Sequence, residues 1–102
     1  MSTPEGAVVR SCLDYLAIRG IFAYRQNTGA AKTESGSYVH FGLVGASDIV
    51  GILPGGRFLA IECKAGRGKT TLDQEQYLAR VREAGGCAIV ARSVDDLIEA
   101  GL

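Results

Sequence analysis

The turn at Pro54-Gly55-Gly56 constrains the fold most strongly, because it separates two apolar runs. Residues 47–53 precede it and are nearly all apolar apart from Asp48, and residues 57–64 follow it. Proline and glycine favour tight turns, and short apolar runs on either side of a turn are typical of paired strands. We therefore expect an antiparallel hairpin whose first strand is buried.

The rest of the chain alternates between helical and extended patterns. Thr3, Thr71 and Ser93 are each placed to cap a helix, and Gln74 completes a capping box with Thr71. Residues 27–37 are rich in glycine and small polar residues, which is typical of a flexible loop or a hairpin. The further expected elements are helices over 4–19, 72–84 and 94–100 and strands over 21–25, 38–41 and 87–91. With no repeat, linker or low-complexity segment, we expect a single mixed α/β domain over residues 1–102.

Composition excludes several classes of protein. An apolar content of 47% with a net charge of zero argues against disorder, and no segment is typical of a membrane span, so we expect no membrane partner. The N-terminus lacks the pattern of a signal peptide. The three cysteines are scattered, form no CxxC motif and fit reduced thiols, which indicates a cytoplasmic protein.

The charges are unevenly placed within this neutral chain. Residues 25–69 contain six basic side chains against three acidic ones, and the remainder has the opposite balance. A basic middle segment is compatible with a surface that faces phosphates.

The strand expected at 57–64 carries two charged residues on one face. Side chains alternate along a strand, so Glu62 and Lys64 share a face with Phe58 and Ala60. The predicted hairpin brings Asp48 close to this end. Two converging carboxylates repel each other unless a cation lies between them, and carboxylate oxygens suit Mg²⁺ or Mn²⁺. The alternative is a plain ion pair at the end of a strand.

These residues, in this order, resemble the PD-(D/E)xK nucleases, and most closely their virus-type replication–repair nuclease (VRR-NUC) branch. Asp48 and the segment Glu62-Cys63-Lys64 match the Asp…Glu-x-Lys signature, and Ser47 replaces the proline that names the superfamily. The other matching features, which together cover nearly the whole chain, are an N-terminal helix with an acid (Glu5), the segment Arg25-Gln26-Asn27-Thr28-Gly29, a glycine-rich approach over 42–48 and a glutamine-bearing helix (Gln76).

The resemblance implies a restriction-endonuclease-like fold and a role for each matching residue. Asp48, Glu62 and the Cys63 backbone carbonyl would hold Mg²⁺ or Mn²⁺, with Glu5 completing the shell. Lys64 would orient or help deprotonate the attacking water. Gln76 would steady Lys64 or that water. The alternatives are that Glu5 only favours the helix N-terminus and that Gln76 is a solvated helix residue.

Several further polar residues are expected to contact DNA. Gln26 and Asn27 would contact the scissile phosphate or support the site, while Lys32, Arg67 and Lys69 would contact backbone phosphates. Gly68-Lys69-Thr70 is similar to the end of a P-loop, but Cys63 stands where that motif requires its first glycine.

Together these features predict a small metal-dependent endodeoxyribonuclease. Stand-alone members of the VRR-NUC branch resemble junction resolvases, so we expect a homodimer that prefers branched or four-way-junction DNA. Tyr15, Ile18, Phe22 and Tyr24 are candidates for the shared face, or else ordinary core residues. The alternatives are a non-catalytic DNA-binding module with a degenerate site, and an exonuclease piece of a larger assembly.

Overall fold

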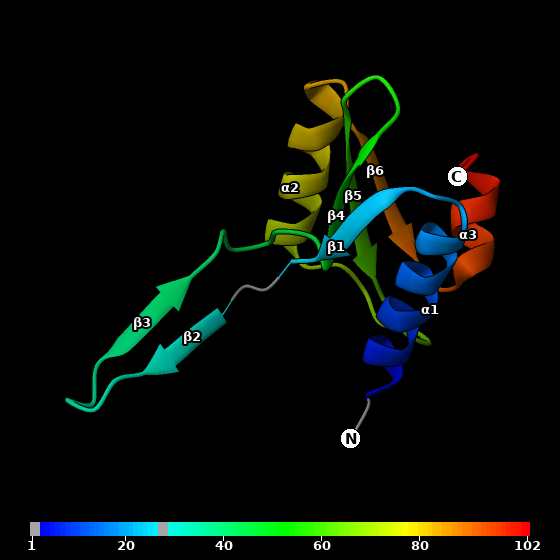
Figure 1. Ribbon diagram of the computed structural model, residues 1–102. Coiled ribbons are helices and arrows are strands. Elements are labelled where there is room, and N and C mark those ends of the chain that lie inside the picture. The colour runs from blue at the N-terminus through cyan, green and yellow to red at the C-terminus, as the bar shows by residue number, and fades with distance from the viewer. Residues whose placement is uncertain (1–2, 27–28) are drawn as a thin grey trace.

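The computed structural model describes residues 3–26 and 29–102, with the backbone alone in the segments 29–32 and 39–41 (Figure 1). The elements in chain order are α1 (Pro4–Ile18), β1 (Phe22–Arg25), β2 (Gly29–Lys32), β3 (Tyr38–Phe41), β4 (Ile49–Leu53), β5 (Arg57–Cys63), α2 (Leu72–Glu83), β6 (Cys87–Ala91) and α3 (Val94–Glu99). The expected mixed α/β architecture is confirmed.

Four strands form one mixed sheet in the order β1-β4-β5-β6. β4 pairs antiparallel with both β1 and β5, whereas β5 and β6 run parallel because α2 connects them. The hairpin predicted around Pro54 is confirmed, with Ile49 opposite Ile61. The first strand was expected to start at Ser47, but regular pairing starts only at Ile49, and Ser47 and Asp48 belong to the approach.

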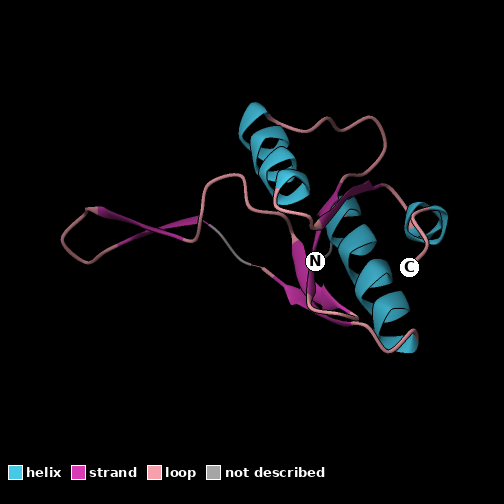
Figure 2. Cartoon of the chain, turned by 90° about the horizontal axis from the view of Figure 1, so that it is seen from above, coloured by secondary structure: helices cyan, strands magenta, loops and turns pink. Residues whose placement is uncertain are grey.

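Helices cover the two faces of the sheet unequally. α1 and α3 pack together against one face, and α2 packs against the other face over β5 and β6 (Figure 2). The core between α1, α3 and the sheet contains Val9, Cys12, Leu16, Ile49, Leu59, Ile61, Cys63, Ala91 and Leu97. The predicted alternation along β5 therefore holds, yet Ala60 and Glu62 on its opposite face are also buried, because α2 lies over them.

The N-cap residues predicted from the sequence form side-chain capping bonds in two of the three helices. Thr3 Oγ1 accepts a hydrogen bond from the Gly6 backbone, and Thr71 and Gln74 form both bonds of the predicted capping box. Ser93 occupies the third N-cap position without a capping bond from its side chain. Instead, the Asp96 carboxylate accepts a hydrogen bond from the Arg92 backbone N–H, and this bond links the first turn of α3 to the residue after β6.

β2 and β3 form a separate two-stranded ribbon that extends away from the sheet (Figure 1). The sequence predicted either a flexible loop or a hairpin for residues 27–37. The described part of this segment belongs to a hairpin. Among the described residues no helix is both long and apolar enough to cross a lipid bilayer.

Candidate metal centre

Three carboxylates from three different elements meet at one end of the four-stranded sheet. Glu5 lies in the first turn of α1, Asp48 lies just before β4, and Glu62 lies next to the last residue of β5. One carboxylate oxygen of each lies within 4.8 Å of those of the other two. The structure therefore assembles the three acids named from the sequence as metal ligands.

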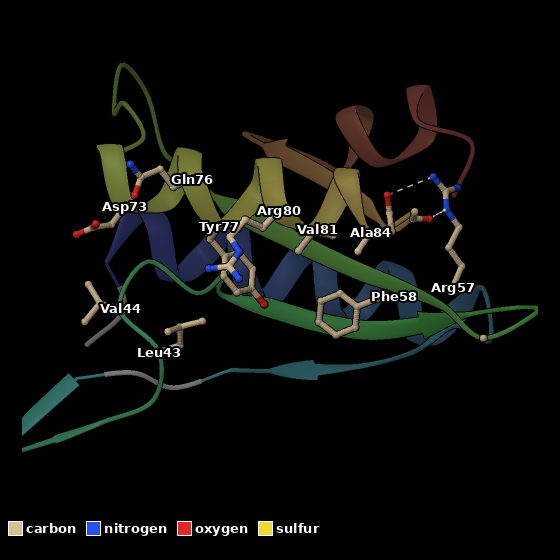
Figure 3. Close-up of a pocket in the computed structure, with 13 residues that line it drawn as sticks. Leu43, Val44, Arg57, Phe58, Asp73, Gln76, Tyr77, Arg80, Val81 and Ala84 are labelled. Carbon is tan, nitrogen blue, oxygen red and sulfur yellow. Dashed lines mark hydrogen bonds between the residues drawn. The ribbon is translucent and has the colours of Figure 1, made fainter.

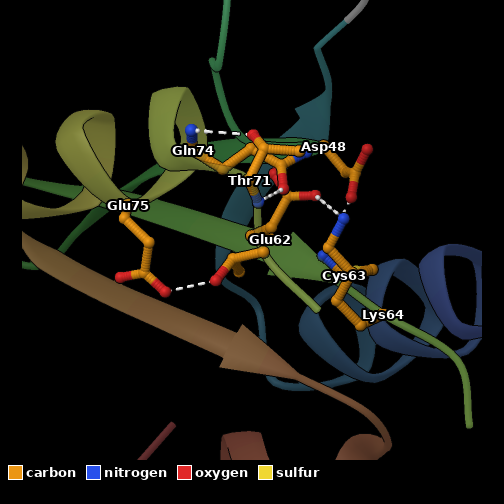
Figure 4. A network of polar contacts seen from close by, with 8 residues as sticks. Asp48, Glu62, Cys63, Lys64, Thr71, Gln74 and Glu75 are labelled. Atoms are coloured by element: carbon orange, nitrogen blue, oxygen red, sulfur yellow. Dashed lines mark hydrogen bonds and ion pairs between the residues drawn. The ribbon is translucent and has the colours of Figure 1, made fainter. Parts of the chain in front are cut away.

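Backbone hydrogen bonds hold Asp48 in this place. Its carbonyl accepts from the Gln26 backbone N–H at 2.7 Å, which joins the approach to the end of β1. Its carboxylate Oδ2 accepts from the Cys63 backbone N–H at 2.8 Å, which joins it to β5 (Figure 4). The Cys63 side chain packs in the core with Cys12, so the backbone of this residue contacts the site while its thiol stabilises the fold.

Glu62 and Lys64 form a buried pair beside Asp48 (Figure 4). Their side chains are 2% and 9% exposed, and Lys64 Nζ lies 3.6 Å from Glu62 Oε2. The other oxygen, Glu62 Oε1, is buried without a hydrogen-bond partner among the described residues. Buried carboxylate oxygens are normally satisfied, so this unpaired oxygen leaves a place for a ligand.

The surroundings of Glu62 disfavour its charged form. The pKa of the Glu62 carboxyl is raised to about 8, chiefly by burial and in addition by the hydrogen bond and charge of Asp48 and the charge of Glu5. Lys64 opposes this increase only in part. A cation among the three acids would reverse the effect, since it stabilises the ionised carboxylates. An unpaired buried oxygen and an all-carboxylate donor set fit a hard divalent cation.

No protein-family model and no curated protein matches this chain. The arrangement of the residues themselves therefore carries the functional argument.

The other residues named from the sequence come from several different segments of the chain. Arg67 and Lys69 are exposed on the loop between β5 and α2. Gln26 is half-buried beside Asp48, so it lies at the site. Lys32 ends β2, and only its backbone is described. Asn27 lies outside the described residues.

Gln76 is exposed on α2 and lines a groove between this helix and the sheet. Its predicted role beside Lys64 stays a prediction, as does that of the Cys63 carbonyl.

The sequence did not reveal the contact that holds the basic loop. Arg92, which follows β6, donates from its guanidinium to the Gly66 carbonyl at 2.9 Å. This bond links two segments that are distant in sequence and fixes the loop that carries Arg67 and Lys69 to the end of β6. No local pattern signals such a contact, since an arginine after a strand is usually solvated.

A groove between α2 and the sheet was also not foreseen (Figure 3). It has a volume of about 740 Å³, and its walls include Leu43, Val44, Phe58, Tyr77, Arg80 and Val81. Arg57 closes one end by donating to the carbonyls of Gly85 and Gly86 at 2.9 and 3.4 Å. The groove exists because α2 covers β5 and β6 but leaves the β1 side of the same face open.

Proposed function

We propose that this protein is a metal-dependent endodeoxyribonuclease with a restriction-endonuclease-like PD-(D/E)xK fold of the VRR-NUC type, active within a bacterial or phage-infected cell. The observation that carries the proposal is the convergence of Glu5, Asp48 and Glu62 with Lys64 beside them. Three acids and a lysine at the end of a mixed sheet supply the groups that phosphodiester hydrolysis requires.

The residues of the chain divide the work as follows. Asp48 and Glu62 would hold Mg²⁺ or Mn²⁺, with Glu5 and the Cys63 carbonyl as further oxygen ligands. The bound ion supplies Lewis-acid stabilisation of the phosphate and lowers the pKa of a coordinated water. Lys64, held 3.6 Å from Glu62, places a positive charge where the phosphate accumulates negative charge and where the attacking water must be oriented.

Positive side chains on the loop that follows Lys64 and at the end of β1 would suit a polyanionic substrate. Arg67 and Lys69 lie on the loop that the Arg92 bond holds in place, and Arg25 ends β1 on the other side. Lysine and arginine near a hydrolytic centre can bind the phosphates that flank the scissile bond. Gln26 lies close enough to Asp48 to support the centre or contact the same phosphate.

Incubation of supercoiled plasmid with the protein tests this function. We expect nicked and linear products with Mg²⁺ or Mn²⁺, none with EDTA, and none for Asp48→Asn in either metal. The matched control is Asp14→Asn, which removes an exposed acid of α1 and should cut like the wild type. Cleavage by Asp48→Asn, or equal cleavage in EDTA, would contradict the proposal.

A non-catalytic DNA-binding module is the second candidate. The unpaired oxygen of Glu62 argues against it, because a site that has lost its metal would be expected to satisfy or replace a buried acid. Calorimetry separates the two candidates, since a nuclease must bind the divalent cation and a degenerate module need not.

We also propose that the protein acts as a homodimer on branched DNA. Phe22, Ile52 and Phe58 form a row across β1, β4 and β5, and they are 64%, 50% and 41% exposed. Together with Tyr24 this row is an apolar surface next to the groove. The three aromatic residues together expose about 300 Å², which lies within the usual size of the largest apolar patch on a monomer, and such patches are often functional.

The four residues suggested for a shared face do not lie together. Tyr15 packs against the core on the α1 side and donates its hydroxyl to the Leu102 carbonyl at 2.9 Å, so it is a structural residue. Ile18, at the end of α1, is 84% exposed. Phe22 and Tyr24 belong to the opposite face of the sheet, beside Ile52.

Light scattering at micromolar concentration should give the mass of two chains. Phe22→Lys places a charge in the apolar row and should produce a monomer with an unchanged circular dichroism spectrum. Ile18→Lys is the matched control and should remain dimeric. A wild-type mass of one chain, both with and without junction DNA, would exclude the dimer. In a separate cleavage assay, a dimer should make paired nicks across a four-way junction.

A further inference from the structure

β2 and β3 form a two-stranded ribbon that extends beyond the body of the protein (Figures 1 and 2). Its strands pair from Gly29 with Phe41 to Lys32 with Tyr38. At the tip, the Thr33 backbone N–H donates to the Ser37 carbonyl at 2.7 Å, and Thr33 Oγ1 lies 2.9 Å from Ser35 Oγ. These bonds fold the tip into one defined turn.

The described segments that flank the ribbon are held by the body of the protein. On one side the chain leaves β1, and Gln26 is bonded to Asp48. On the other side the chain returns through Gly45, where an added Cβ would lie 2.5 Å from the Asp73 carbonyl oxygen at the start of α2. Gly45 also has a φ of +84°, so close contact with α2 and its backbone conformation both require glycine. The described segments on either side of the ribbon are therefore fixed to the body of the protein, one of them at Asp48.

An isolated two-stranded ribbon is only marginally stable in water. This ribbon pairs within itself, and both views show it extending away from the sheet and the helices (Figures 1 and 2). A hairpin in this position gains more stability from an external partner than from the body of its own chain.

We propose that the ribbon inserts into the major groove of duplex DNA next to the phosphate held at the metal centre. This inference rests on the proposed nuclease function and names the part of the substrate that the protein grips. The major groove is about 12 Å wide and 8.5 Å deep and admits a two-stranded ribbon. Four residues at about 3.4 Å each extend about 14 Å, enough to reach its floor.

The chemistry of the tip fits the edges of bases better than a protein surface. Residues 33–37 are small or polar, and Glu34, Ser35 and Ser37 are exposed. Serine and threonine hydroxyls donate to and accept from base edges, and a carboxylate accepts from the N4 amine of cytosine. Glu34 would be repelled by phosphates, so its place at the end of the ribbon fits the groove floor rather than the DNA backbone.

A second copy of the chain is the competing partner. Protein interfaces are built around apolar and aromatic anchors, and the row of Phe22, Ile52 and Phe58 with Tyr24 provides such anchors on the open face of the sheet rather than at the tip. Tyr38, at the start of β3, is the large exposed side chain nearest to the tip among the described residues. Its position near the end of a strand suits contact with the wall of the groove.

The test compares the wild type with a protein that lacks the ribbon. Gly29 and Phe41 are paired opposite each other, so an Asn-Gly turn can join them in place of residues 30–40. Binding to a short duplex is measured in Ca²⁺, and dimethyl sulfate reports access to guanine N7 in the major groove. We expect wild-type protection of guanine N7 and its loss without the ribbon, with affinity at least about tenfold weaker.

Glu34→Gln provides a variant that does not alter the backbone. It should reduce discrimination at one base pair by about tenfold and leave overall duplex affinity little changed, whereas Glu99→Gln, an exposed acid on α3, should change neither. Calorimetric binding of Mg²⁺ by the ribbon-less protein verifies that its metal centre is intact.

Several results would overturn the inference. For the wild type, these are a failure to bind duplex DNA or protection confined to adenine N3 in the minor groove. For the protein without the ribbon, they are unchanged protection of guanine N7, or a change from dimer to monomer while DNA protection is retained. The last result would assign the ribbon to a second copy. If the wild type protects N7 but never cuts plasmid, the ribbon proposal stands and the nuclease proposal fails.

Discussion

Glu62→Gln is expected to lose metal-dependent cleavage by at least about a thousandfold while making the metal-free protein more stable above neutral pH. The loss follows because an amide cannot replace the charge of a carboxylate ligand. The gain follows because the folded protein holds the Glu62 carboxyl at a pKa of about 8, whereas the unfolded chain ionises near its ordinary value of about 4.3. The variant removes the carboxyl that the fold disfavours in its ionised form.

The direction of the pH effect follows from proton binding. Between about pH 4.5 and 8 the folded state binds a proton at Glu62 that the unfolded state has released, so wild-type stability falls as pH rises through this window. The difference between the variant and the wild type should therefore grow from about pH 5 to about pH 9 and reach a few kcal/mol. Urea unfolding at the two pH values measures it.

Two controls separate the metal role from a general effect of the substitution. Glu99→Gln removes an exposed acid of α3 and should leave both the cleavage rate and the pH dependence unchanged. Saturating Mg²⁺ should stabilise the wild type more at pH 8 than at pH 6, because protons compete with the cation for Glu62. A Glu62→Gln protein that still cuts would exclude Glu62 as a metal ligand.

Lys64→Met is expected to slow cleavage by at least about a hundredfold, the scale of one positioned charge or proton donor. Methionine fills a similar volume at this buried position, so the change removes the charge with little loss of packing. Because Lys64 is assigned to the chemical step, Mg²⁺ affinity in calorimetry should change little by comparison, and substrate KM should stay within a few-fold.

Arg10→Met is the control for Lys64, since it removes an exposed positive charge from α1 and should not alter the rate. A Lys64→Met protein that cuts at nearly the wild-type rate would leave Lys64 as an ion-pair partner of Glu62. A protein that loses Mg²⁺ affinity in proportion to its rate would instead assign Lys64 to organisation of the metal centre.

Local signals predicted most of the elements and the core of the site. The turn at Pro54 fixed the hairpin, and the hairpin register brought Asp48 to Glu62 without any knowledge of the remaining fold. The capping box of Thr71 located the start of α2 in the same way. These predictions succeeded because each depends on residues that are close in sequence or on one antiparallel pairing.

Features that depend on tertiary packing were not predictable. The coverage of only half of one sheet face by α2 decides that Phe22 is exposed and Ala60 is buried, although both belong to apolar strands. The bond from Arg92 to Gly66 likewise joins segments that only the finished fold brings together. The choice between loop and ribbon for residues 27–37 depended on pairing with β3, which a glycine-rich sequence specifies weakly.

The wide separation of the three acids along the chain has a consequence for folding. Glu5, Asp48 and Glu62 come from the first helix and from two strands in the middle of the chain, so a bound ion would cross-link segments that the unfolded chain leaves far apart. Such a link removes conformational freedom from the chain in the manner of a disulfide, and it forms only after α1 has docked on the sheet. A partly synthesised or locally unfolded chain cannot bring these three carboxylates together, so the proposed metal centre would exist only in the fully folded molecule.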